Sequence, residues 1–284
     1  MNLTSLSAQL EMTDDEYRLL RNLVYEECGI RLNDEKKSFL MSRALRRMNA
    51  LKVTSYYRYF KLLTGKGEKS QELLAFLDAL TINETSFFRN RPQMDLFAKK
   101  VLPEIVAKKR ERKDLTLRLW SAGCSTGQEP YTLAMIIRDT LMDLKSWKVT
   151  ILASDLSLTA LEAAERGVYT AEKLEGVEQR LVNWSFVKVD GGYKVTDELK
   201  KMVVFDYHNL MNENGTKDFD VIFCRNVLIY FDEQTQRKVI DKFHRSLLPN
   251  GYIFLGHSET LQGINDNFVF IHHKRGTAYR KKEG

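Results

Sequence analysis

A loop of small residues from Gly123 to Gly127 has the composition of a ligand-binding turn. It reads Gly-Cys-Ser-Thr-Gly and follows a segment with leucine at every second position, which is the period of a β-strand. Glycine has no side chain, so a bound molecule can approach the backbone closely at either end of the loop. An apolar helical run comes next, and a second apolar strand then ends on Asp155. Strand, loop, helix, strand and terminal acid predict a βαβ unit that holds a nucleoside, with the acid placed to hydrogen-bond ribose hydroxyls.

The spacing of the two loop glycines distinguishes between classes of nucleotide. The dinucleotide fingerprint is G-x-G-x-x-G, whereas this loop is G-x-x-x-G and no Lys-Ser/Thr pair follows it. Glu129 and Pro130 open the next helix, where a phosphate would need bare N–H groups and no carboxylate. These features favour a nucleoside without phosphates, such as an S-adenosyl group, whose sulfonium cation a carboxylate tolerates. The alternative is a turn that only packs the core of an α/β protein.

Length and composition are those of an ordinary globular protein. The chain has 284 residues, 43% hydrophobic and 29% charged, which suits one large or two modest domains. Met1–Ser5 lack the pattern of a signal peptide, and no apolar stretch reaches membrane-spanning length. Three distant cysteines without C-x-x-C spacing indicate reduced thiols, so we expect a cytoplasmic protein. The net charge of +6 suits an acidic partner surface and does not demand nucleic acid.

The first third of the chain predicts a small bundle of helices. A capping box at Thr13–Glu16 begins the first helix. The second helix, from Asp34 to Leu51, gathers apolar residues on one side and Arg43, Arg46 and Arg47 on the other. This basic face is either a solvated helix surface or a docking surface for an acidic helical partner. Two further helices are predicted at Ser55 to Leu63 and Ser70 to Leu80, separated by Gly65-Lys66-Gly67.

Strands alternate with helices through the rest of the chain, which predicts a doubly wound, mostly parallel sheet. Ligands of such sheets bind outside the carboxyl ends of the strands, so we expect Asp155, Asn209 and Asn226 to converge beside Gly123. An antiparallel hairpin from Phe186 to Val195 interrupts the alternation and turns at Asp-Gly-Gly. The other strands are predicted at 149–155, 203–207, 219–224 and 252–256, with a closing hairpin at 268–271 and 277–280. Helices are predicted at 93–112, 158–166 and 233–248.

Four motifs occur in order along nearly the whole chain. Beginning at Asn83, Ser121, Phe223 and Gly256, they read Asn-Glu-Thr-Ser-Phe-Phe-Arg, Ser-Ala-Gly-Cys-Ser-Thr-Gly-Gln-Glu-Pro-Tyr, Phe-Cys-Arg-Asn-Val-Leu-Ile-Tyr-Phe and Gly-His-Ser-Glu. With an all-helical segment in front of them, the chain resembles the chemotaxis receptor methyltransferases, the CheR family. The resemblance implies methyl transfer from S-adenosylmethionine to glutamate side chains of membrane chemoreceptors. The products would be glutamyl methyl esters and S-adenosylhomocysteine.

The resemblance also implies a domain organisation and a set of site residues. A helical domain would occupy residues 1–88 and a methyltransferase domain residues 89–284, with a β-subdomain inserted at about 184–202. Arg89 and Tyr230 would lie closest to the reacting centre, with Arg89 either orienting the acceptor carboxylate or holding the carboxylate of the cofactor. No metal site is expected. The implied cofactor-binding residues are Asn83, Thr85, Arg89, Gly123, Glu129, Asp155, Asn209, Leu210, Asn226 and Val227.

The partner implied by the resemblance is the cytoplasmic helical bundle of membrane chemoreceptors, with no nucleic acid and no insertion into the membrane. In the family, an antiparallel subdomain can grip a tethering peptide at the C-termini of some receptors. The short turn of the hairpin here predicts docking without such a peptide, through Arg43, Arg46 and Arg47.

Alternative chemistries fit the motifs less well. An enzyme that methylates the amino group of adenine would carry Pro-Pro after the fourth strand, and a cytosine C5 enzyme would need Pro-Cys where Cys224 follows Phe223. A nucleic-acid-binding protein would need aromatic residues interleaved with basic ones on an exposed sheet. The remaining alternative function is a non-catalytic regulatory module that keeps the cofactor pocket.

Overall fold

The computed structural model of the chain describes residues 11–65, 69–213 and 215–283. Met1–Ser5, on which the signal-peptide expectation depends, and Lys66-Gly67, between two predicted helices, lie outside the described residues.

The chain divides into two compact units. Met1–Ile82 together with Tyr230–Asp232 form one of them, called the helical unit below. Asn83–Ile229 together with Glu233–Gly284 form the other, called the sheet unit. Each unit therefore contains segments that are distant in the sequence.

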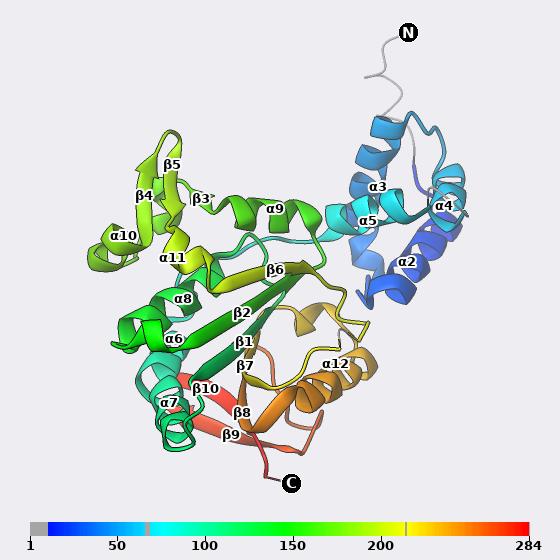
Figure 1. The fold of residues 1–284 in the computed structure, drawn as a ribbon. Helices are drawn as coiled ribbons and strands as arrows, with labels where there is room; N and C mark the ends of the chain where they lie inside the picture. The colour runs from blue at the N-terminus through cyan, green and yellow to red at the C-terminus, as the bar shows by residue number, and fades with distance from the viewer. Residues whose placement is uncertain (1–10, 66–68, 214, 284) are drawn as a thin grey trace. The chain divides into compact units, whose positions relative to one another are not determined.

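The described part of the helical unit is a bundle of α-helices, as predicted (Figure 1). The capping box is confirmed, because the Thr13 hydroxyl accepts the Glu16 N–H while the Glu16 carboxylate accepts the Thr13 N–H. Gly29 ends the first helix with φ of 73°, a left-handed conformation that suits glycine. The helices are α2 (Asp14–Cys28), α3 (Lys37–Leu51), α4 (Tyr56–Thr64) and α5 (Lys69–Leu80).

Tyr230–Asp232 pair with the chain that follows α2. The backbone N–H of Arg31 donates to the carbonyl of Tyr230 at 2.9 Å, and Ile30 and Phe231 form an antiparallel β-bridge. The hydroxyl of Tyr25 donates to the carboxylate of Asp232 at 2.7 Å. These contacts explain why three residues from the far end of the sequence belong to the helical unit.

A seven-stranded sheet forms the core of the sheet unit, in the order β6-β2-β1-β7-β8-β10-β9. The first five of these strands are parallel to one another, and β10 and β9 are antiparallel, which confirms the doubly wound, mostly parallel sheet and its closing hairpin. Figure 1 shows α6 (Arg91–Leu96), α7 (Leu102–Glu111) and α8 (Gln128–Thr140) on one side of the sheet and α12 (Glu233–Ser246) on the other. The strands are β1 (Thr116–Ala122), β2 (Lys148–Asp155), β6 (Val203–Tyr207), β7 (Phe219–Cys224), β8 (Leu247–Leu255), β9 (Phe268–His273) and β10 (Gly276–Lys281).

The predicted helices of the sheet unit are present with one interruption, and two short helices, α10 (Gln179–Ser185) and α11 (Asp197–Lys200), were not predicted. A π-helical turn at Phe97–Val101 divides the helix predicted at 93–112 into α6 and α7. The helices are α6 (Arg91–Leu96), α7 (Leu102–Glu111), α8 (Gln128–Thr140), α9 (Leu158–Arg166), α10 (Gln179–Ser185), α11 (Asp197–Lys200) and α12 (Glu233–Ser246).

The helix before the fifth parallel strand is shorter than predicted. α12 ends at Ser246, and Leu247 already pairs with Phe219 of β7. The register between β7 and β8 then shifts, and Asn250 takes a positive φ of 62° within β8. Leu247 and Leu248 continue the apolar spacing of the helix, so only their cross-strand pairing reveals that they belong to the sheet.

A small antiparallel sheet is inserted in the sheet unit, in the order β3-β5-β4. The predicted hairpin is confirmed: β4 (Phe186–Val189) and β5 (Gly192–Val195) pair across a turn made by Asp190 and Gly191. The short strand β3 (Val168–Tyr169) joins them and was not predicted.

Residues 83–88 lie with the sheet unit, ahead of the predicted domain boundary at 88/89. The Phe87 ring packs edge-on against Tyr169 and Phe186, at 4.9 and 5.5 Å between ring centroids. The Phe88 N–H donates to the Thr132 hydroxyl at 3.1 Å. The motif that begins at Asn83 is therefore an integral part of the sheet unit.

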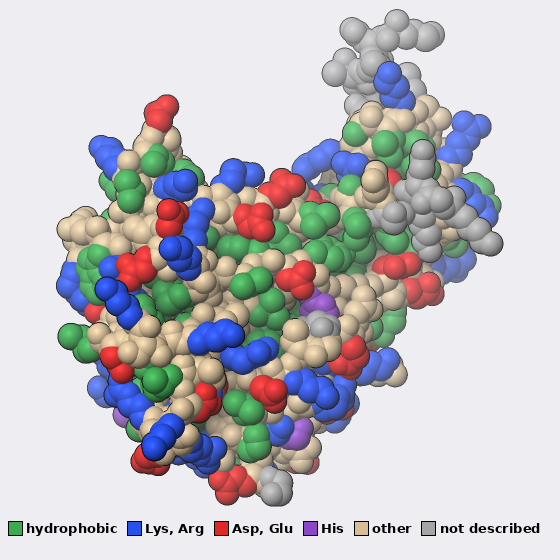
Figure 2. Space-filling view, in the orientation of Figure 1, with side chains coloured by type: hydrophobic (Ala, Val, Ile, Leu, Met, Phe, Trp, Pro, Cys, Tyr) green, Lys and Arg blue, Asp and Glu red, His purple; other side chains and the backbone are tan. Residues whose placement is uncertain are grey.

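Basic and acidic side chains are mixed on the visible face of the sheet unit. Figure 2 shows Lys and Arg side chains interspersed with Asp and Glu over the face of the sheet unit in view. The formal net charge of +6 is thus spread rather than concentrated on this face. Among the helices of the described residues, none has the length and apolarity needed to cross a membrane.

Candidate active site

The Gly123 loop joins the carboxyl end of β1 to the first turn of α8. Gly123 and Gly127 have φ of 80° and 92°, a left-handed region that favours glycine. A Cβ added at Gly123 would lie 2.4 Å from the Cγ2 atom of Val227, which follows β7. Glycine is therefore required here both for the turn and for the close approach of the segment after β7. Gly123 and Val227, two predicted cofactor residues, lie together as expected.

Asp155 ties this loop to the neighbouring strand. Its side chain is 8% exposed, and its two carboxylate oxygens accept the N–H groups of Ser125 at 2.7 Å and Ser157 at 2.9 Å. A carboxylate has about four acceptor positions, so this structural role is compatible with the predicted role toward ribose hydroxyls. Asp155 thus lies at the carboxyl end of β2 beside the glycine loop, as the sequence predicted.

Asn83 reaches the same loop from the segment before α6. Its side-chain amide donates to the Ser157 hydroxyl at 3.4 Å and accepts from the Ser125 hydroxyl at 3.5 Å. Thr85 is half-buried two residues further along. The first motif and the glycine loop therefore contribute to one side of the site.

Asn209 and Leu210 lie in the turn after β6. The Asn209 side-chain oxygen accepts the Met211 N–H at 3.0 Å, so this asparagine shapes its own turn. Leu210 is buried, and its carbonyl accepts a hydrogen bond of 2.5 Å from the ammonium of Lys242 on α12. Lys242 was not predicted, because nothing in the local pattern of α12 marks a lysine that faces inward.

A buried arginine holds the carboxyl end of β7. Arg225 donates to Glu129 at 3.2 Å, to the Gln93 side chain at 3.0 Å and to the backbone carbonyl of Arg89 at 2.6 Å. The remaining oxygen of Glu129 accepts from the Ser121 hydroxyl at 2.7 Å. Arg225 was not predicted as a site residue, although a charged residue directly after a buried strand was a visible signal.

The electrostatics of Glu129 follow from this pairing. Burial raises the pKa of the Glu129 carboxyl above its ordinary value, whereas Arg225 and the Ser121 hydroxyl lower it. The ion pair neutralises much of the charge that the sequence suggested for the start of α8. Glu129 therefore holds the β7 end in place, and its predicted contact with the cofactor stays a prediction.

The residues assembled here fit an S-adenosyl group. Gly123 lets the segment after β7 approach the loop closely, and Asp155 and Asn83 supply polar groups suited to ribose and adenosyl recognition. Glu129 and Pro130 in the first turn of α8 leave no phosphate-type cradle.

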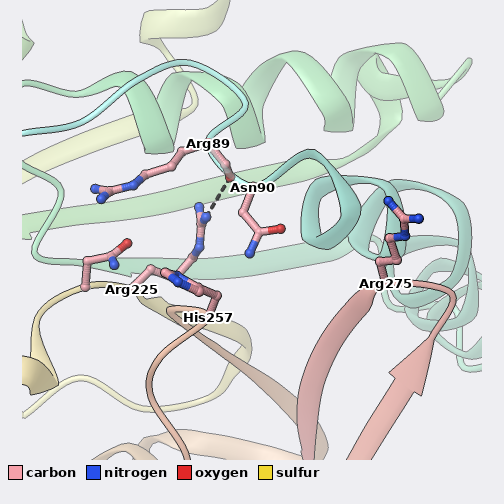
Figure 3. A pocket seen from close by; sticks show the side chains of 6 residues that line it. Arg89, Asn90, Arg225, His257 and Arg275 are labelled. Atoms are coloured by element: carbon pink, nitrogen blue, oxygen red, sulfur yellow. Dashed lines mark hydrogen bonds between the residues drawn. The ribbon is translucent and has the colours of Figure 1, made fainter.

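A cavity of about 430 Å³ opens beside the end of β7, and most of its polar lining is cationic or amide in character. Figure 3 shows Arg225 extending from the end of β7 toward the backbone of Arg89, with His257 below it and Arg275 standing apart at the β9–β10 turn. The Arg89 guanidinium also donates to the carbonyl of Glu84 at 2.9 Å. We call this the cationic pocket; its lining residues are Arg89, Asn90, Arg225, Asn226, His257 and Arg275.

Tyr230 and the predicted docking arginines belong to the helical unit. Arg46 is exposed and Arg43 half-buried with its guanidinium over the Phe39 ring, 5.2 Å from the centroid. Arg47 makes a two-pronged contact with Glu72 at 2.6 and 3.1 Å. Of the three arginines on the predicted face, Arg47 therefore also holds α3 to α5.

The three cysteines are buried, free thiols. Burial raises the pKa of Cys28 to about 12 and the pKa of Cys224 well above its ordinary value. A thiol that resists ionisation is a poor nucleophile. Cys224 is therefore a core residue, as expected, and the cytosine C5 chemistry finds no support.

Two family descriptions match the chain over most of its length. Residues 83–277 match the family described as "CheR methyltransferase, SAM binding domain", and residues 15–81 match "CheR methyltransferase, all-alpha domain". The chain is similar to the chemotaxis protein methyltransferase of Borreliella burgdorferi, with 35% identity over 95% of this chain and 96% of that protein. It is also similar to chemotaxis protein methyltransferase 2 of Vibrio cholerae, with 33% identity over 96% and 95% of the two chains. The chemotaxis protein methyltransferase of Escherichia coli is 35% identical over 94% and 92%.

Proposed function

The chain belongs to the CheR methyltransferase family, and from this premise we propose that it methylates glutamate side chains of chemoreceptors for chemotactic adaptation. The products are glutamyl methyl esters and S-adenosylhomocysteine. When bound, S-adenosylmethionine supplies an electrophilic methyl group. Gly123, Asp155, Asn209, Asn226 and Val227 are the residues that we expect to hold this cofactor.

The observation that carries the glutamate proposal is the cationic pocket. Arg275 and His257 are exposed at its rim, and Arg225 lies in its wall beside Asn226. A glutamate carboxylate is an anion, and the planar guanidinium of arginine matches its two oxygens. A cationic amine acceptor would gain nothing from these arginines.

The chemistry asks little of the protein beyond positioning. Glutamate has an unperturbed pKa of about 4.3, so the acceptor is already ionised at neutral pH and needs no general base. Correct alignment of the reacting groups can remove roughly 7–11 kcal/mol of the barrier. The acceptor loses its negative charge as the ester forms, so cations around it stabilise bound substrate at least as well as the transition state. Arg275 therefore serves substrate binding more than the chemical step.

The proposal is tested with the full-length protein, radiolabelled S-adenosylmethionine and the cytoplasmic fragment of a chemoreceptor. We expect label in the receptor that alkali releases as methanol, because alkali cleaves a methyl ester and leaves an N-methyl group intact. Asp155→Ala should lower the affinity for S-adenosylhomocysteine, measured by calorimetry, by at least about tenfold, since it also frees the Ser125 N–H that the carboxylate holds. Asp190→Ala, in the exposed turn of the hairpin, is the matched control.

Two results would count against the proposal in different ways. Binding of S-adenosylhomocysteine without any transfer of label would favour the non-catalytic regulatory module. Alkali-stable label would show a methyltransferase with another acceptor.

The role of the cationic pocket predicts a particular kinetic defect. Arg275→Ala should raise the KM for the receptor fragment about tenfold, the value of one charge-assisted hydrogen bond, with kcat within about twofold of wild type. Steady-state kinetics at varied receptor concentration measure both constants. Arg110→Ala, which removes an exposed arginine paired with Asp143, should change neither. A fall in kcat with unchanged KM would contradict a substrate-binding role.

A further inference from the structure

Glu259, the last residue of the Gly-His-Ser-Glu motif, lies in a turn after β8 and makes an unusual set of contacts. Its carboxylate accepts hydrogen bonds from four backbone N–H groups. One oxygen accepts from Asn226 at 2.9 Å and from Gly256 at 2.5 Å. The other accepts from Val227 at 2.9 Å and from Ile229 at 3.3 Å.

These contacts bind the carboxyl ends of two neighbouring strands to each other. β7 and β8 are parallel partners, and Cys224 is paired with Leu255 at their last register position. The chain after each strand then turns toward the same carboxylate. A cluster of backbone N–H groups that point inward forms an anion-binding concavity, and here the chain fills it with its own carboxylate.

Gly256 makes this arrangement possible. A Cβ added at Gly256 would lie 2.6 Å from a carboxylate oxygen of Glu259 and 2.9 Å from the backbone nitrogen of Asn226. Any larger residue would push the carboxylate away from the segment after β7. The first and last residues of the motif are thus explained by one contact.

The segment held by Glu259 is the one on which the cofactor site depends. Asn226 has a positive φ of 60°, which is uncommon for a residue other than glycine, and the N–H groups of this residue and the next are both held by the carboxylate. Val227 in turn packs against Gly123, where it leaves no space for a Cβ. The conformation of the segment that carries the predicted cofactor contacts Asn226 and Val227 therefore depends on the carboxylate.

We propose that Glu259 is a positioning residue for methyl transfer, which sets the conformation of residues 226–229 without contacting either reactant. This inference rests on the proposed function only in its kinetic part. Its binding part concerns the affinity for S-adenosylhomocysteine and requires no knowledge of the acceptor. A neutral side chain of the same shape should not replace the carboxylate, because an amide presents one acceptor and an NH₂ donor to four N–H groups.

The test compares Glu259→Gln with wild type and with Glu283→Gln, which neutralises an exposed carboxylate bonded by Asn250. We expect Glu259→Gln to weaken S-adenosylhomocysteine binding at least tenfold, raise the KM for S-adenosylmethionine and lower kcat/KM about a hundredfold, as for a misplaced reacting group. The KM for the receptor fragment should change less than the KM for the cofactor. Glu283→Gln should match wild type.

Two outcomes overturn the proposal. Kinetic and binding constants within about twofold of wild type would show that the carboxylate does not position the segment. A lower thermal midpoint with unchanged KM values and a kcat reduced only in proportion to the folded fraction would show a purely structural role.

A second variant keeps the test available if Glu259→Gln fails to fold. Gly256→Ala leaves the charge in place but displaces the carboxylate through the clash described above. It should reproduce the loss of cofactor affinity, and wild-type affinity in this variant would also overturn the proposal. If wild type binds S-adenosylhomocysteine but methylates nothing, the proposed function fails, while the affinity comparison still decides the role of Glu259.

Discussion

At the scale of single residues, buried charged groups do most of the work of shaping the candidate site. Lys242 is one of them: its ammonium donates to the carbonyls of Leu210 at 2.5 Å and Asn212 at 2.8 Å, and lies 3.4 Å from the His208 ring. Burial lowers the pKa of Lys242 to about 8 and that of His208 to about 4. The turn that carries Asn209 and Leu210 is therefore held by two buried groups, Lys242 and His208, whose pKa values both lie below their ordinary values.

This pair predicts a loss of stability in mild acid. Burial and the charge of Lys242 lower the pKa of His208 from 6.5 to about 4, while the charges of Asp206 and Glu213 act in the opposite direction. In the unfolded chain this histidine binds a proton below about pH 6.5, whereas in the folded chain it does so only below about pH 4. The free energy of unfolding therefore falls as the pH falls from about 6.5 to about 4. Partial solvent screening reduces the loss to about 1–2 kcal/mol at pH 5.

Urea unfolding at pH 5 and pH 7.5 measures the effect. His208→Gln, which cannot titrate, should show a smaller difference between the two pH values than wild type. His272→Gln, which removes an exposed histidine on β9, should behave as wild type. An equal pH dependence in wild type and His208→Gln would contradict the assignment.

At the scale of elements, α3 has two kinds of arginine on what the sequence presents as one basic face. Arg47 pairs with Glu72, whose carboxylate also accepts the Tyr59 hydroxyl at 2.6 Å. Glu72 and Tyr59 are buried, so this network stabilises the packing of α3 on α5 and α4. The Arg47–Glu72–Tyr59 network does not include Arg43 or Arg46, which are the better candidates for contact with an acidic receptor helix.

The docking hypothesis therefore predicts a selective defect in Arg43→Glu/Arg46→Glu. Charge reversal should raise the KM for the receptor fragment about tenfold or more through like-charge repulsion, with unchanged affinity for S-adenosylhomocysteine. Kinetics at two salt concentrations should show the difference shrink at high salt, because exposed charges are screened. A free peptide from a receptor C-terminus should not compete. Loss of cofactor binding in the double variant would mean that α3 has been damaged rather than its surface.

How far the sequence leads differs between elements. Periodicity and capping predict α2, the parallel strands and the β4–β5 hairpin, because those signals are local. The convergence of Asp155 and Asn226 beside Gly123 follows from one rule about parallel sheets. The end of α12 at Ser246 cannot be predicted from local signals, because pairing with β7 determines where β8 begins.

The contributions of Lys242 and Glu259 are likewise absent from the sequence pattern, and for Arg225 the pattern shows only a charged residue after a buried strand. Each is a charged residue whose role depends on partners from other elements, such as Glu129 for Arg225 and the N–H groups after β7 for Glu259. The spacing of residues along the chain does not reveal those partners. Motifs identify such residues as a group, and only the structure shows which groups each of them contacts.

At the scale of the whole molecule, the division into units does not follow the order of the chain. Tyr230–Asp232 belong to the helical unit although Ile229 and Glu233 on either side belong to the sheet unit. Tyr230, the predicted catalytic tyrosine, is therefore held by the backbone of Arg31 and flanked by the Ile30–Phe231 bridge. The position of Tyr230 therefore depends on the segment that follows α2, which lies in the first part of the sequence.

This interleaving has a consequence for how such proteins can be recombined. A helical unit exchanged between relatives to change receptor choice would arrive without its own Tyr230–Asp232, which stay behind in the recipient gene. In such a chimera, Tyr25 comes from one relative and Asp232, which accepts its hydrogen bond, from the other. A crossover at Ile82 therefore separates two residues that must match. Functional chimeras should therefore be those whose exchanged segments include both ends of that bond, so that the tripeptide 230–232 is inherited together with the helices that it contacts.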